Sequence, residues 1–303
     1  MSFMDRVLER ARDIKARVVL AEGDDARVQE AATKIERMGL ASVQLLSRSL
    51  PMARLPMVAL LRNRRPDKFP TEVAALQALA HPLLFGACLV AVGEADVMVG
   101  GAVYTSAETI RAALLAVGTA PGIATVSGAF YMTKGDQVLT FADSAVCPEP
   151  TAAQLSDIAI AAARERRRIV GDEPVVAFLS YSTKGSAAGP RIDRVRAGIE
   201  ELRKRQPDFV FDGELQVDAA LVPDVAARKA PGSAAAGHAN VLIFPDLDAA
   251  NIGYKLVQRL GGWSAFGPIL QGLARPIADL SRGATADDIV DTAAIAVLQS
   301  REG

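Results

Sequence analysis

Histidine and cysteine are both scarce in this sequence, with two of each among 303 residues. Cys88 and Cys147 are too few for a disulfide framework or a cysteine-based metal cluster, which fits a protein of a reducing compartment. His81 and His238 lie far apart, whereas zinc sites and histidine-based nucleophilic triads need several converging groups. We therefore expect no metal site, and we expect any catalysis to rest on other side chains.

Net charge and long apolar runs are also lacking. The formal net charge is −1, so no bulk field draws the chain to nucleic acid or to anionic lipid. The first residues, Met1 to Arg17, follow a charged helical pattern and not that of a signal peptide. No apolar run reaches the length of a membrane span without polar interruption. The sequence is therefore typical of a soluble cytoplasmic protein whose partners are neither nucleic acid nor membrane.

Familiar nucleotide-binding motifs are missing as well. No Gly-x-Gly-x-x-Gly follows the first predicted strand, which argues against an ordinary dinucleotide-binding Rossmann domain. The loop Ser180–Ser186 is rich in hydroxyls and contains Lys184, but it lacks the spacing of a P-loop. A metal-dependent decarboxylating dehydrogenase needs paired aspartates for its metal, and no convincing pair is evident. The sequence therefore disfavours these classes of enzyme.

The sequence is rich in short apolar strands that alternate with helices. Half of the residues are hydrophobic, enough to bury a core, and the length fits two domains or one large one. The alternation predicts an α/β fold of two doubly wound domains with mostly parallel sheets. Residues 1–145 together with 273–303 are predicted to form the first domain, and residues 146–272 the second. The segment Asp143–Thr151, which contains two prolines, is interpreted as a linker.

The predicted elements place several loops at the carboxyl ends of strands, where ligands bind in open α/β sheets. Strands are predicted at Arg17–Ala21, Ser42–Leu46, Val97–Val99, Thr125–Met132, Val138–Ala142, Val175–Ser180, Phe209–Glu214 and Ala239–Pro245. Helices are predicted at Ser2–Ala16, Ala26–Met38, Thr71–Ala80, Pro82–Val92, Ala107–Val117, Ala152–Ile169, Pro190–Arg205, Ala219–Ala227, Ile252–Leu260 and Asp287–Ser300. The segment Ser47–Pro70, with four prolines, is predicted to be irregular.

One of these loops combines three chemically active groups. A strand-like approach ends at Ser281 and Arg282, and a helix follows with Thr285 as its predicted cap. Asp288 comes three residues after that cap. A hydroxyl, a fixed positive charge and a carboxylate in one turn can hold an oxyanion and accept a proton. The structural alternative, which the segment alone favours, is a capping box in which Asp288 satisfies the main-chain N–H of Thr285.

Two further segments are candidates for binding a phosphate group. A Gly100-Gly101 pair opens a strand-to-helix loop, and main-chain N–H groups of such a loop can hold an anion, although an ordinary turn is the alternative. Arg111 lies one turn along the next helix and can point back toward that anion. The basic cluster of the irregular segment is interpreted either as a solvated connection or as an anion-binding arm, and it comprises Arg62, Arg64 and Arg65.

Several long runs resemble phosphate acetyltransferases, in the same order along the chain. They are Phe141–Thr151 (FADSAVCPEPT), Leu179–Ser186 (LSYSTKGS), Asp212–Gln216 (DGELQ), Asn240–Leu247 (NVLIFPDL), Asn251–Leu260 (NIGYKLVQRL), Gly267–Gly272 (GPILQG) and Leu280–Gly283 (LSRG). The resemblance covers nearly everything after Leu83 and, more loosely, Arg17–Gly39. The wider family includes phosphate butyryltransferases.

The resemblance implies reversible transfer of an acetyl group between acetyl phosphate and coenzyme A. It also implies two α/β domains with a cleft between them, and a homodimer. The catalytic serine, arginine and aspartate of the family match Ser281, Arg282 and Asp288, and a second active-site arginine matches Arg111. A further arginine of the first domain falls in the irregular segment, where Arg62 and Arg65 are both candidates.

The mechanism that the resemblance implies is direct attack by the thiolate of coenzyme A. Asp288 is expected to act as general base, provided that burial raises its pKa, while Arg282 and Ser281 stabilise the oxyanion. Arg111 and one arginine of the irregular segment would clamp the phosphate, for which the guanidinium geometry is suited. Coenzyme A is then a substrate, and neither a metal nor a permanently bound cofactor is needed.

Other substrate-binding residues are expected at Thr105, Ser106, Lys184 and Asn251. Lys184 is equally interpretable as an ordinary surface lysine, and Asn251 as a helix cap. The chain departs from the family pattern in Ser47–Pro70, which is shorter than usual. Two alternatives therefore remain beside the acetyltransferase: a phosphate butyryltransferase, and a non-catalytic acyl-CoA-binding or regulatory homologue.

Overall fold

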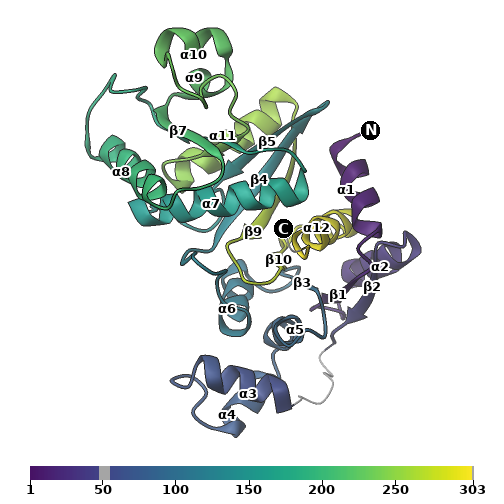
Figure 1. The fold of residues 1–303 in the computed structure, drawn as a ribbon. Helices are drawn as coiled ribbons and strands as arrows, with labels where there is room; N and C mark the ends of the chain where they lie inside the picture. Colours follow the sequence, from purple (N-terminus) through teal and green to yellow (C-terminus); the bar gives the residue numbers. More distant parts are fainter. Residues whose placement is uncertain (48–54, 302–303) are drawn as a thin grey trace. The chain divides into compact units, whose positions relative to one another are not determined.

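The computed structural model describes residues 1–47 and 55–301 of the chain (Figure 1). The described chain forms two compact units. The first unit contains Phe3–Pro121 and the C-terminal segment from Leu273, and the second contains Gly122–Gly272. Each unit has its own sheet, and most neighbouring strands in these sheets are parallel. The predicted α/β class with mostly parallel sheets is confirmed.

A four-stranded parallel sheet forms the centre of the first unit, in the order β10-β3-β1-β2. Its strands are β1 (Ala16–Leu20), β2 (Ala41–Leu45), β3 (Val97–Gly100) and β10 (Ile277–Asp279). Every residue of β3 and β10 is buried, as expected for parallel strands covered on both faces. The direction of winding reverses between β1 and β3. The carboxyl ends of these two strands are therefore where this fold places a ligand.

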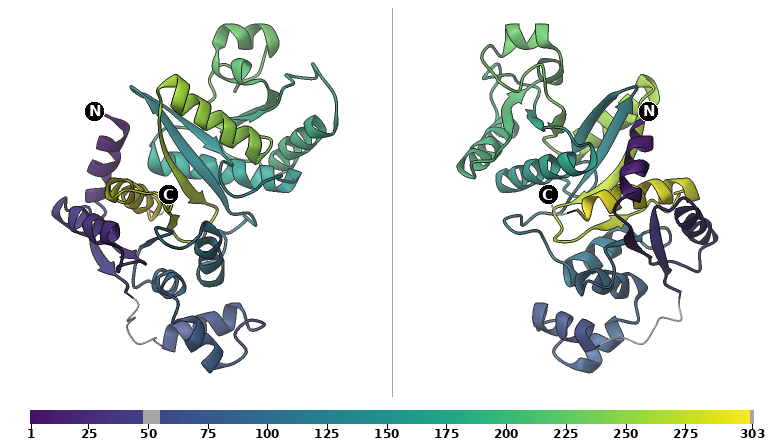
Figure 2. Two further views of the ribbon diagram at one scale, coloured as in Figure 1. Left: turned by 180° about the vertical axis from the view of Figure 1, so that it is seen from behind. Right: turned by 45° about the vertical axis from the view of Figure 1, so that its right-hand side comes forward.

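Helices cover both faces of this sheet (Figures 1 and 2). On one face α12 (Ala286–Gln299) packs against α1 (Phe3–Arg12) and α2 (Ala26–Arg37). On the other face, one apolar core joins strand residues such as Val19 and Met98 to four helices. These helices are α3 (Leu55–Arg64), α4 (Glu72–Ala78), α5 (Pro82–Ala91) and α6 (Ser106–Ala116).

Helix α3 corrects the prediction of irregular structure for Ser47–Pro70. Pro56 stands at its second position, where the missing N–H costs no intrahelical hydrogen bond. Met57, Val58 and Leu61 are buried in the core of the first unit, so tertiary packing outweighs the high proline content. Residues 48–54 of the same segment lie outside the described part of the chain.

A six-stranded mixed sheet forms the centre of the second unit, in the order β7-β6-β8-β5-β4-β9. Strands β7, β6, β8 and β5 are parallel, whereas β4 runs antiparallel to both β5 and β9. The strands are β4 (Ser127–Lys134), β5 (Gln137–Ala142), β6 (Val175–Leu179), β7 (Val210–Leu215), β8 (Val241–Ile243) and β9 (Ser264–Gln271). The helices are α7 (Ala152–Ile169), α8 (Pro190–Lys204), α9 (Val217–Leu221), α10 (Pro223–Lys229) and α11 (Leu247–Gly261).

The first crossing between the units lies at Pro121–Gly122 and not after residue 145 as predicted. The reason is that strands β4 and β5 hydrogen-bond into the second sheet. The predicted linker Asp143–Thr151 is correspondingly part of the second unit. Its first residue is buried, and the Asp143 carboxylate accepts hydrogen bonds from the main-chain N–H groups of Gly128, Ala145 and Cys147.

The helix predicted over Ala219–Ala227 is divided in two, because Pro223 begins α10 directly after α9. Among the described residues, no single helix is long and apolar enough to cross a membrane. Helices α4 and α5 pass that test only when taken together, and they are bent by 110° relative to each other.

The end of β7 carries an ion pair between a buried carboxylate and a partly exposed arginine, which stabilises the second unit. Glu214 is 3% exposed. Its carboxylate accepts hydrogen bonds from the Arg196 guanidinium at 2.9 and 3.0 Å, from the Ser182 hydroxyl at 2.9 Å and from the Gly185 N–H at 2.9 Å. Burial by itself raises the pKa of Glu214, but these hydrogen bonds outweigh it and lower the pKa to about 2.

We predict that Glu214→Gln destabilises the second unit by about 2 kcal/mol at neutral pH, because it removes the charge that pairs with Arg196. A larger effect is not expected, because solvent screens part of this salt bridge. The folded pKa lies below the ordinary 4.5. The stabilisation is therefore complete above pH 4.5 and is lost as the pH falls toward 2. Urea unfolding followed by fluorescence of Trp263, the single tryptophan and a residue of this unit, measures the difference between variant and wild type.

The matched control is Glu201→Gln, which removes an exposed i,i+3 partner of Lys204 and is expected to change stability far less. The gap between Glu214→Gln and wild type must shrink as the pH is lowered. A gap that stays constant down to acidic pH would contradict the assigned role of the Glu214 charge.

Candidate active site

The turn after β10 presents Ser281 and Arg282 at the carboxyl edge of the first sheet. Strand β10 pairs with β3, and the pairing ends where the Leu280 N–H donates to the Gly100 carbonyl at 2.8 Å. The chain then turns sharply, with the Ala284 N–H donating to the Ser281 carbonyl at 2.9 Å. The Ser281 hydroxyl oxygen accepts a hydrogen bond from the Gly283 N–H at 3.2 Å. This arrangement leaves the hydroxyl hydrogen available as a donor.

The Arg282 side chain is exposed, and its guanidinium makes no hydrogen bond or ion pair within the described part of the chain. A guanidinium carries five N–H donors and keeps its charge at any physiological pH. At the end of a parallel strand, beside a hydroxyl donor, it is suited to stabilising a developing oxyanion.

Asp288 forms the predicted capping box at the start of α12. One carboxylate oxygen, Oδ2, accepts from both the N–H and the hydroxyl of Thr285 at 2.8 Å, and the Asp288 N–H donates to the Thr285 hydroxyl at 3.2 Å. The structural interpretation is therefore confirmed. The burial on which its expected role as general base was made to depend is absent, because the Asp288 side chain is exposed. The second oxygen, Oδ1, has no hydrogen-bond partner among the described residues and remains available to accept a proton.

A third acid on the same helix was not predicted as a site residue. Asp291 lies one turn after Asp288 and is partly buried. Burial, and then the charges of Asp288 and Asp287, raise the pKa of Asp291 to about 6. The sequence does show three acids at this spacing, but only the packed helix shows which of them is desolvated.

The loop between β3 and α6 does not present an empty N–H cradle, which corrects the expectation of a phosphate site there. The buried Glu22 carboxylate fills it, accepting from four consecutive main-chain N–H groups, those of Gly101 to Tyr104, at 2.8–3.2 Å. Glu22 follows β1, so an acid from the neighbouring strand takes the place that an anion would occupy. Its position directly after β1 was the only sequence signal for this role.

The hydroxyls of this loop are also engaged. Thr105 is the N-cap of α6 and forms a capping box with Glu108. The Ser106 hydroxyl donates to Asp279, the last residue of β10. Asp279 is buried, and burial raises its pKa despite that hydrogen bond. Its Oδ1 has no hydrogen-bond partner among the described residues. Gly101 is required here, because its φ is +100° and an added Cβ would lie 2.6 Å from Asp279 Oδ1.

A hollow of about 230 Å³ lies at the carboxyl ends of β1 and β3. Its polar lining includes Glu22, Asp24 and Asp25 from the loop after β1, and Tyr104 from the loop after β3. The lining is acidic and contains no arginine. Such an acidic lining does not favour a phosphate group.

The arginines of the first unit differ in whether their side chains already make hydrogen bonds within the protein. Arg64 donates to the Val117 carbonyl at 2.8 Å and so caps the C-terminal end of α6. The side chains of Arg62, Arg65 and Arg111 make no hydrogen bond within the described chain. Arg62 is exposed in the last turn of α3, and Arg65 follows that helix directly. Arg111 is exposed on α6, against which α3 packs.

Two predicted residues belong to the second unit. Lys184, in the loop after β6, forms an ion pair with Asp212 and donates to the Gly213 carbonyl at 3.0 Å. Asn251 lies within α11 and not at its start. The helix cap is Asp246, whose carboxylate accepts from the Ala249 N–H at 2.9 Å, so the interpretation of Asn251 as a cap is wrong.

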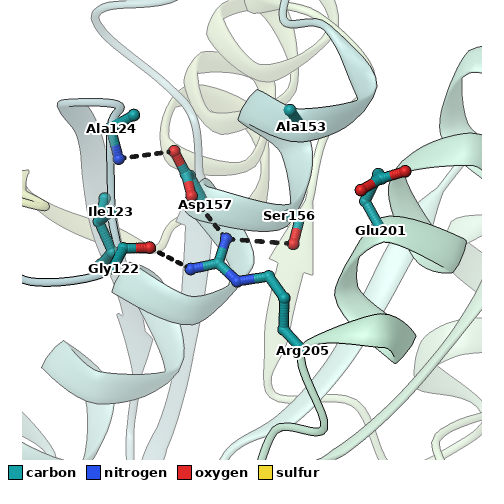
Figure 3. A pocket seen from close by; sticks show the side chains of 8 residues that line it. All are labelled: Gly122, Ile123, Ala124, Ala153, Ser156, Asp157, Glu201 and Arg205. Carbon is teal, nitrogen blue, oxygen red and sulfur yellow. Dashed lines mark hydrogen bonds and ion pairs between the residues drawn. The ribbon is translucent and has the colours of Figure 1, made fainter.

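A cavity of about 360 Å³ in the second unit is lined by none of the predicted site residues (Figure 3). Two of its charged groups, Arg205 and Asp157, form an ion pair. Arg205 pairs with Asp157 at 2.6 Å and also donates to the Gly122 carbonyl, while Asp157 accepts from the Ala124 N–H at 2.9 Å. These bonds anchor the first residues of the unit to α7 and α8.

A model of the phosphate acetyl/butaryl transferase family matches residues 2–55 and 57–297. The chain belongs to this family. The phosphate acetyltransferase of Acetivibrio thermocellus is 43% identical over 328 residues, with 99% of each chain covered, and that of Clostridium acetobutylicum is 42% identical over the full length of both. A phosphotransacetylase from Streptococcus pyogenes has a similar structure, with a TM-score of 0.90, 39% identity and 98% of each chain covered.

The family match is interrupted at residue 56, inside the segment Ser47–Pro70. In this family member Ser281, Arg282 and Asp288 share one turn, and Arg111 lies on the helix that follows the neighbouring strand. The structure thus places the four predicted catalytic residues on loops and helices that follow two adjacent strands of one sheet, β3 and β10. Glu22, Asp279 and Asp291 are the buried or half-buried acids that sequence reasoning missed.

We predict that Glu22→Gln loosens the β3–α6 loop. The amide keeps the size of the side chain but replaces an accepting oxygen by a donor, which leaves buried N–H groups unsatisfied at a cost of about 1–3 kcal/mol. Hydrogen exchange of the amides of Gly101–Tyr104 should accelerate by about 10-fold or more. Glu36→Gln, an exposed change on α2, serves as the control. Unchanged exchange in Glu22→Gln would contradict the role assigned to this carboxylate.

Proposed function

We propose that this chain is a phosphate acetyltransferase, which transfers an acetyl group reversibly between acetyl phosphate and coenzyme A. Full-length relatives with this name and 42–43% identity support the proposal. The observation that carries it is the turn after β10. There a free guanidinium, a hydroxyl donor and a carboxylate with one unoccupied oxygen lie within eight residues, Ser281 to Asp288.

The proposed reaction begins with proton transfer from the thiol of coenzyme A to Asp288. The thiol is a poor nucleophile until it is deprotonated. The thiolate then attacks the carbonyl carbon of acetyl phosphate, and the carbonyl electrons move to the oxygen. Arg282 and the Ser281 hydroxyl stabilise that oxyanion, and its collapse breaks the bond to phosphate. Inorganic phosphate and acetyl-CoA are the products, and no step calls for a metal, a covalent enzyme intermediate or a permanently bound cofactor.

Exposed arginines of the first unit would bind the phosphate group of acetyl phosphate. Arg111 is the first candidate, with Arg62 and Arg65 as the others, because their guanidinium groups are not already occupied. Bidentate contacts from such groups are the strongest available for a phosphate. Lys184 and Asn251 remain proposed contacts for coenzyme A. Thr105 and Ser106 are weaker candidates than the sequence suggested, since their hydroxyls serve Glu108 and Asp279.

We predict that Arg282→Ala lowers kcat by about 10²–10³-fold, the usual effect of losing one oxyanion donor.

Asp288→Asn should lower kcat by about 10²–10⁴-fold, the usual contribution of a general base. Its matched control is Asp287→Asn, which removes the neighbouring exposed acid and should leave kcat nearly unchanged. The assay measures phosphate-dependent release of coenzyme A from acetyl-CoA. Equal rates for Asp288→Asn and wild type would rule out Asp288 as the base.

Two further measurements on the wild-type protein test the alternatives, a phosphate butyryltransferase and a non-catalytic binder. A coupled assay with acetyl phosphate and with butyryl phosphate distinguishes an acetyltransferase from a butyryltransferase. Calorimetry with acetyl-CoA identifies a non-catalytic binder, which would bind tightly without turnover. Absence of both turnover and binding in the wild-type protein would overturn the proposed function.

We further propose that the protein is a homodimer that meets a second copy through α11. Ile252, Leu256 and Leu260 recur every four residues on this helix and are 59%, 52% and 82% exposed. Exposed apolar stripes of this kind mark association surfaces. In the proposed two-fold dimer this apolar stripe would pack against the same stripe of the second copy. A reducing, cytoplasmic setting fits the proposal, since Cys88 and Cys147 are both free thiols.

We predict that Leu256→Glu converts the dimer into a monomer, because it places a charge in the centre of the apolar contact. Light scattering coupled to gel filtration measures the mass. Val217→Glu, at a residue 51% exposed outside the stripe, should leave the dimer intact. A monomeric wild-type protein, or a Leu256→Glu variant that stays dimeric, would contradict this interface.

A further inference from the structure

Arg27 is the second residue of α2, and its side chain is oriented by the residue that caps the helix. The Asp25 carboxylate accepts from the Arg27 N–H at 2.8 Å, from Nε at 3.1 Å and from Nη2 at 2.8 Å. The pair is a bidentate contact of the kind that fixes a guanidinium in one plane. The Asp25 side chain is only 18% exposed, which limits solvent screening of the pair.

The other N–H groups of Arg27 bind main-chain carbonyls of two distant loops. Nη1 donates to the carbonyls of Arg282 at 2.9 Å and Ala284 at 2.8 Å, and Nη2 donates to the carbonyl of Ala102 at 2.9 Å. With the bonds to Asp25, all five donors of the guanidinium are used. Arg27 therefore has no donor left for a substrate, and it joins the turn after β10 to the loop after β3.

The remaining contacts of this turn are local or weak. Within the described chain, the other hydrogen bonds of residues 281–284 link Ser281 to Gly283 and Ala284. A second tie between α2 and the start of α12, the ion pair Lys34–Asp287, is exposed, with 81% of the Asp287 side chain accessible. Such exposed pairs add little rigidity. Arg27 is thus the long-range contact that orients the main chain carrying Ser281 and Arg282.

We propose that Arg27 is a positioning residue for acyl transfer. It holds the carbonyls of Arg282 and Ala284 so that the Ser281 hydroxyl and the Arg282 guanidinium meet the developing oxyanion. The inference rests on the acetyltransferase function proposed above. Misplacing catalytic groups by about 1 Å commonly costs about 10²-fold in rate, without a comparable effect on ground-state binding.

The test compares Arg27→Ala, Arg27→Lys and Asp25→Asn with wild type. Arg27→Ala should lower kcat by about 10²-fold, while KM for coenzyme A and acetyl phosphate stays within about threefold. Millimolar guanidinium should restore part of the lost kcat, and ammonium should not. Arg27→Lys should not restore it, because a lysine lacks the planar fork. Asp25→Asn retains a capping side chain and should give an intermediate loss. Arg37→Ala, an exposed arginine at the other end of α2, is the matched control.

A second readout does not depend on activity. Hydrogen exchange of the amides of Gly283 and Ala284 should accelerate in Arg27→Ala and return toward wild type with guanidinium. An inactive wild-type protein would overturn the proposed function, whereas this measurement would still show whether Arg27 orders the turn. Unchanged kcat in Arg27→Ala overturns the positioning role. So does a rise in KM alone, which would make Arg27 a binding residue, and so does a loss of kcat that guanidinium fails to restore.

Discussion

Two oppositely charged side chains hold the main chain at the carboxyl edge of the four-stranded sheet, and the geometry of the loops after β3 and β10 depends on them. Glu22 accepts the N–H groups of the loop after β3. Arg27 donates to carbonyls of that loop and of the turn after β10. Each such group, left buried and unpaired, would cost roughly 1–3 kcal/mol. That cost is large beside the conformational preferences of short glycine-containing loops, so these two side chains decide how the loops lie.

The hydrogen bonds of Glu22 and Arg27 also explain which polar groups remain available to a substrate. A main-chain N–H cradle filled by Glu22 cannot bind a phosphate, and an arginine whose donors are all taken, such as Arg27, cannot do so either. Arg64 is likewise occupied as a helix cap. Within the described chain the guanidinium groups of Arg62, Arg65, Arg111 and Arg282 make no hydrogen bond. Arg282 lies on the loop after β10, and Arg111 lies on the helix after the adjacent strand β3.

Local features were predictable from the sequence and long-range pairings were not. The capping box of Thr285 and Asp288 follows from a spacing of three residues, and it is present. The contacts of Arg27 with the turn after β10 join residues more than 250 positions apart, and no sequence spacing predicts them. The boundary between the units was misplaced for a similar reason, since a hairpin pattern does not reveal which sheet it joins. Helix α3 was missed because proline content was weighed without knowledge of the core it packs against.

The capping and catalytic interpretations of Asp288 do not compete, because they use different oxygens. Capping occupies Oδ2 and fixes the carboxylate against the start of α12, while Oδ1 makes no hydrogen bond within the described chain. A carboxylate that is exposed but held in one orientation by the cap would lose little entropy on meeting a thiol. The adjacent acid that is desolvated is Asp291, and burial with neighbouring charge keeps its pKa near 6. Helix α12 therefore carries an accessible carboxylate at its cap and, one turn further on, a partly buried carboxyl group with a raised pKa.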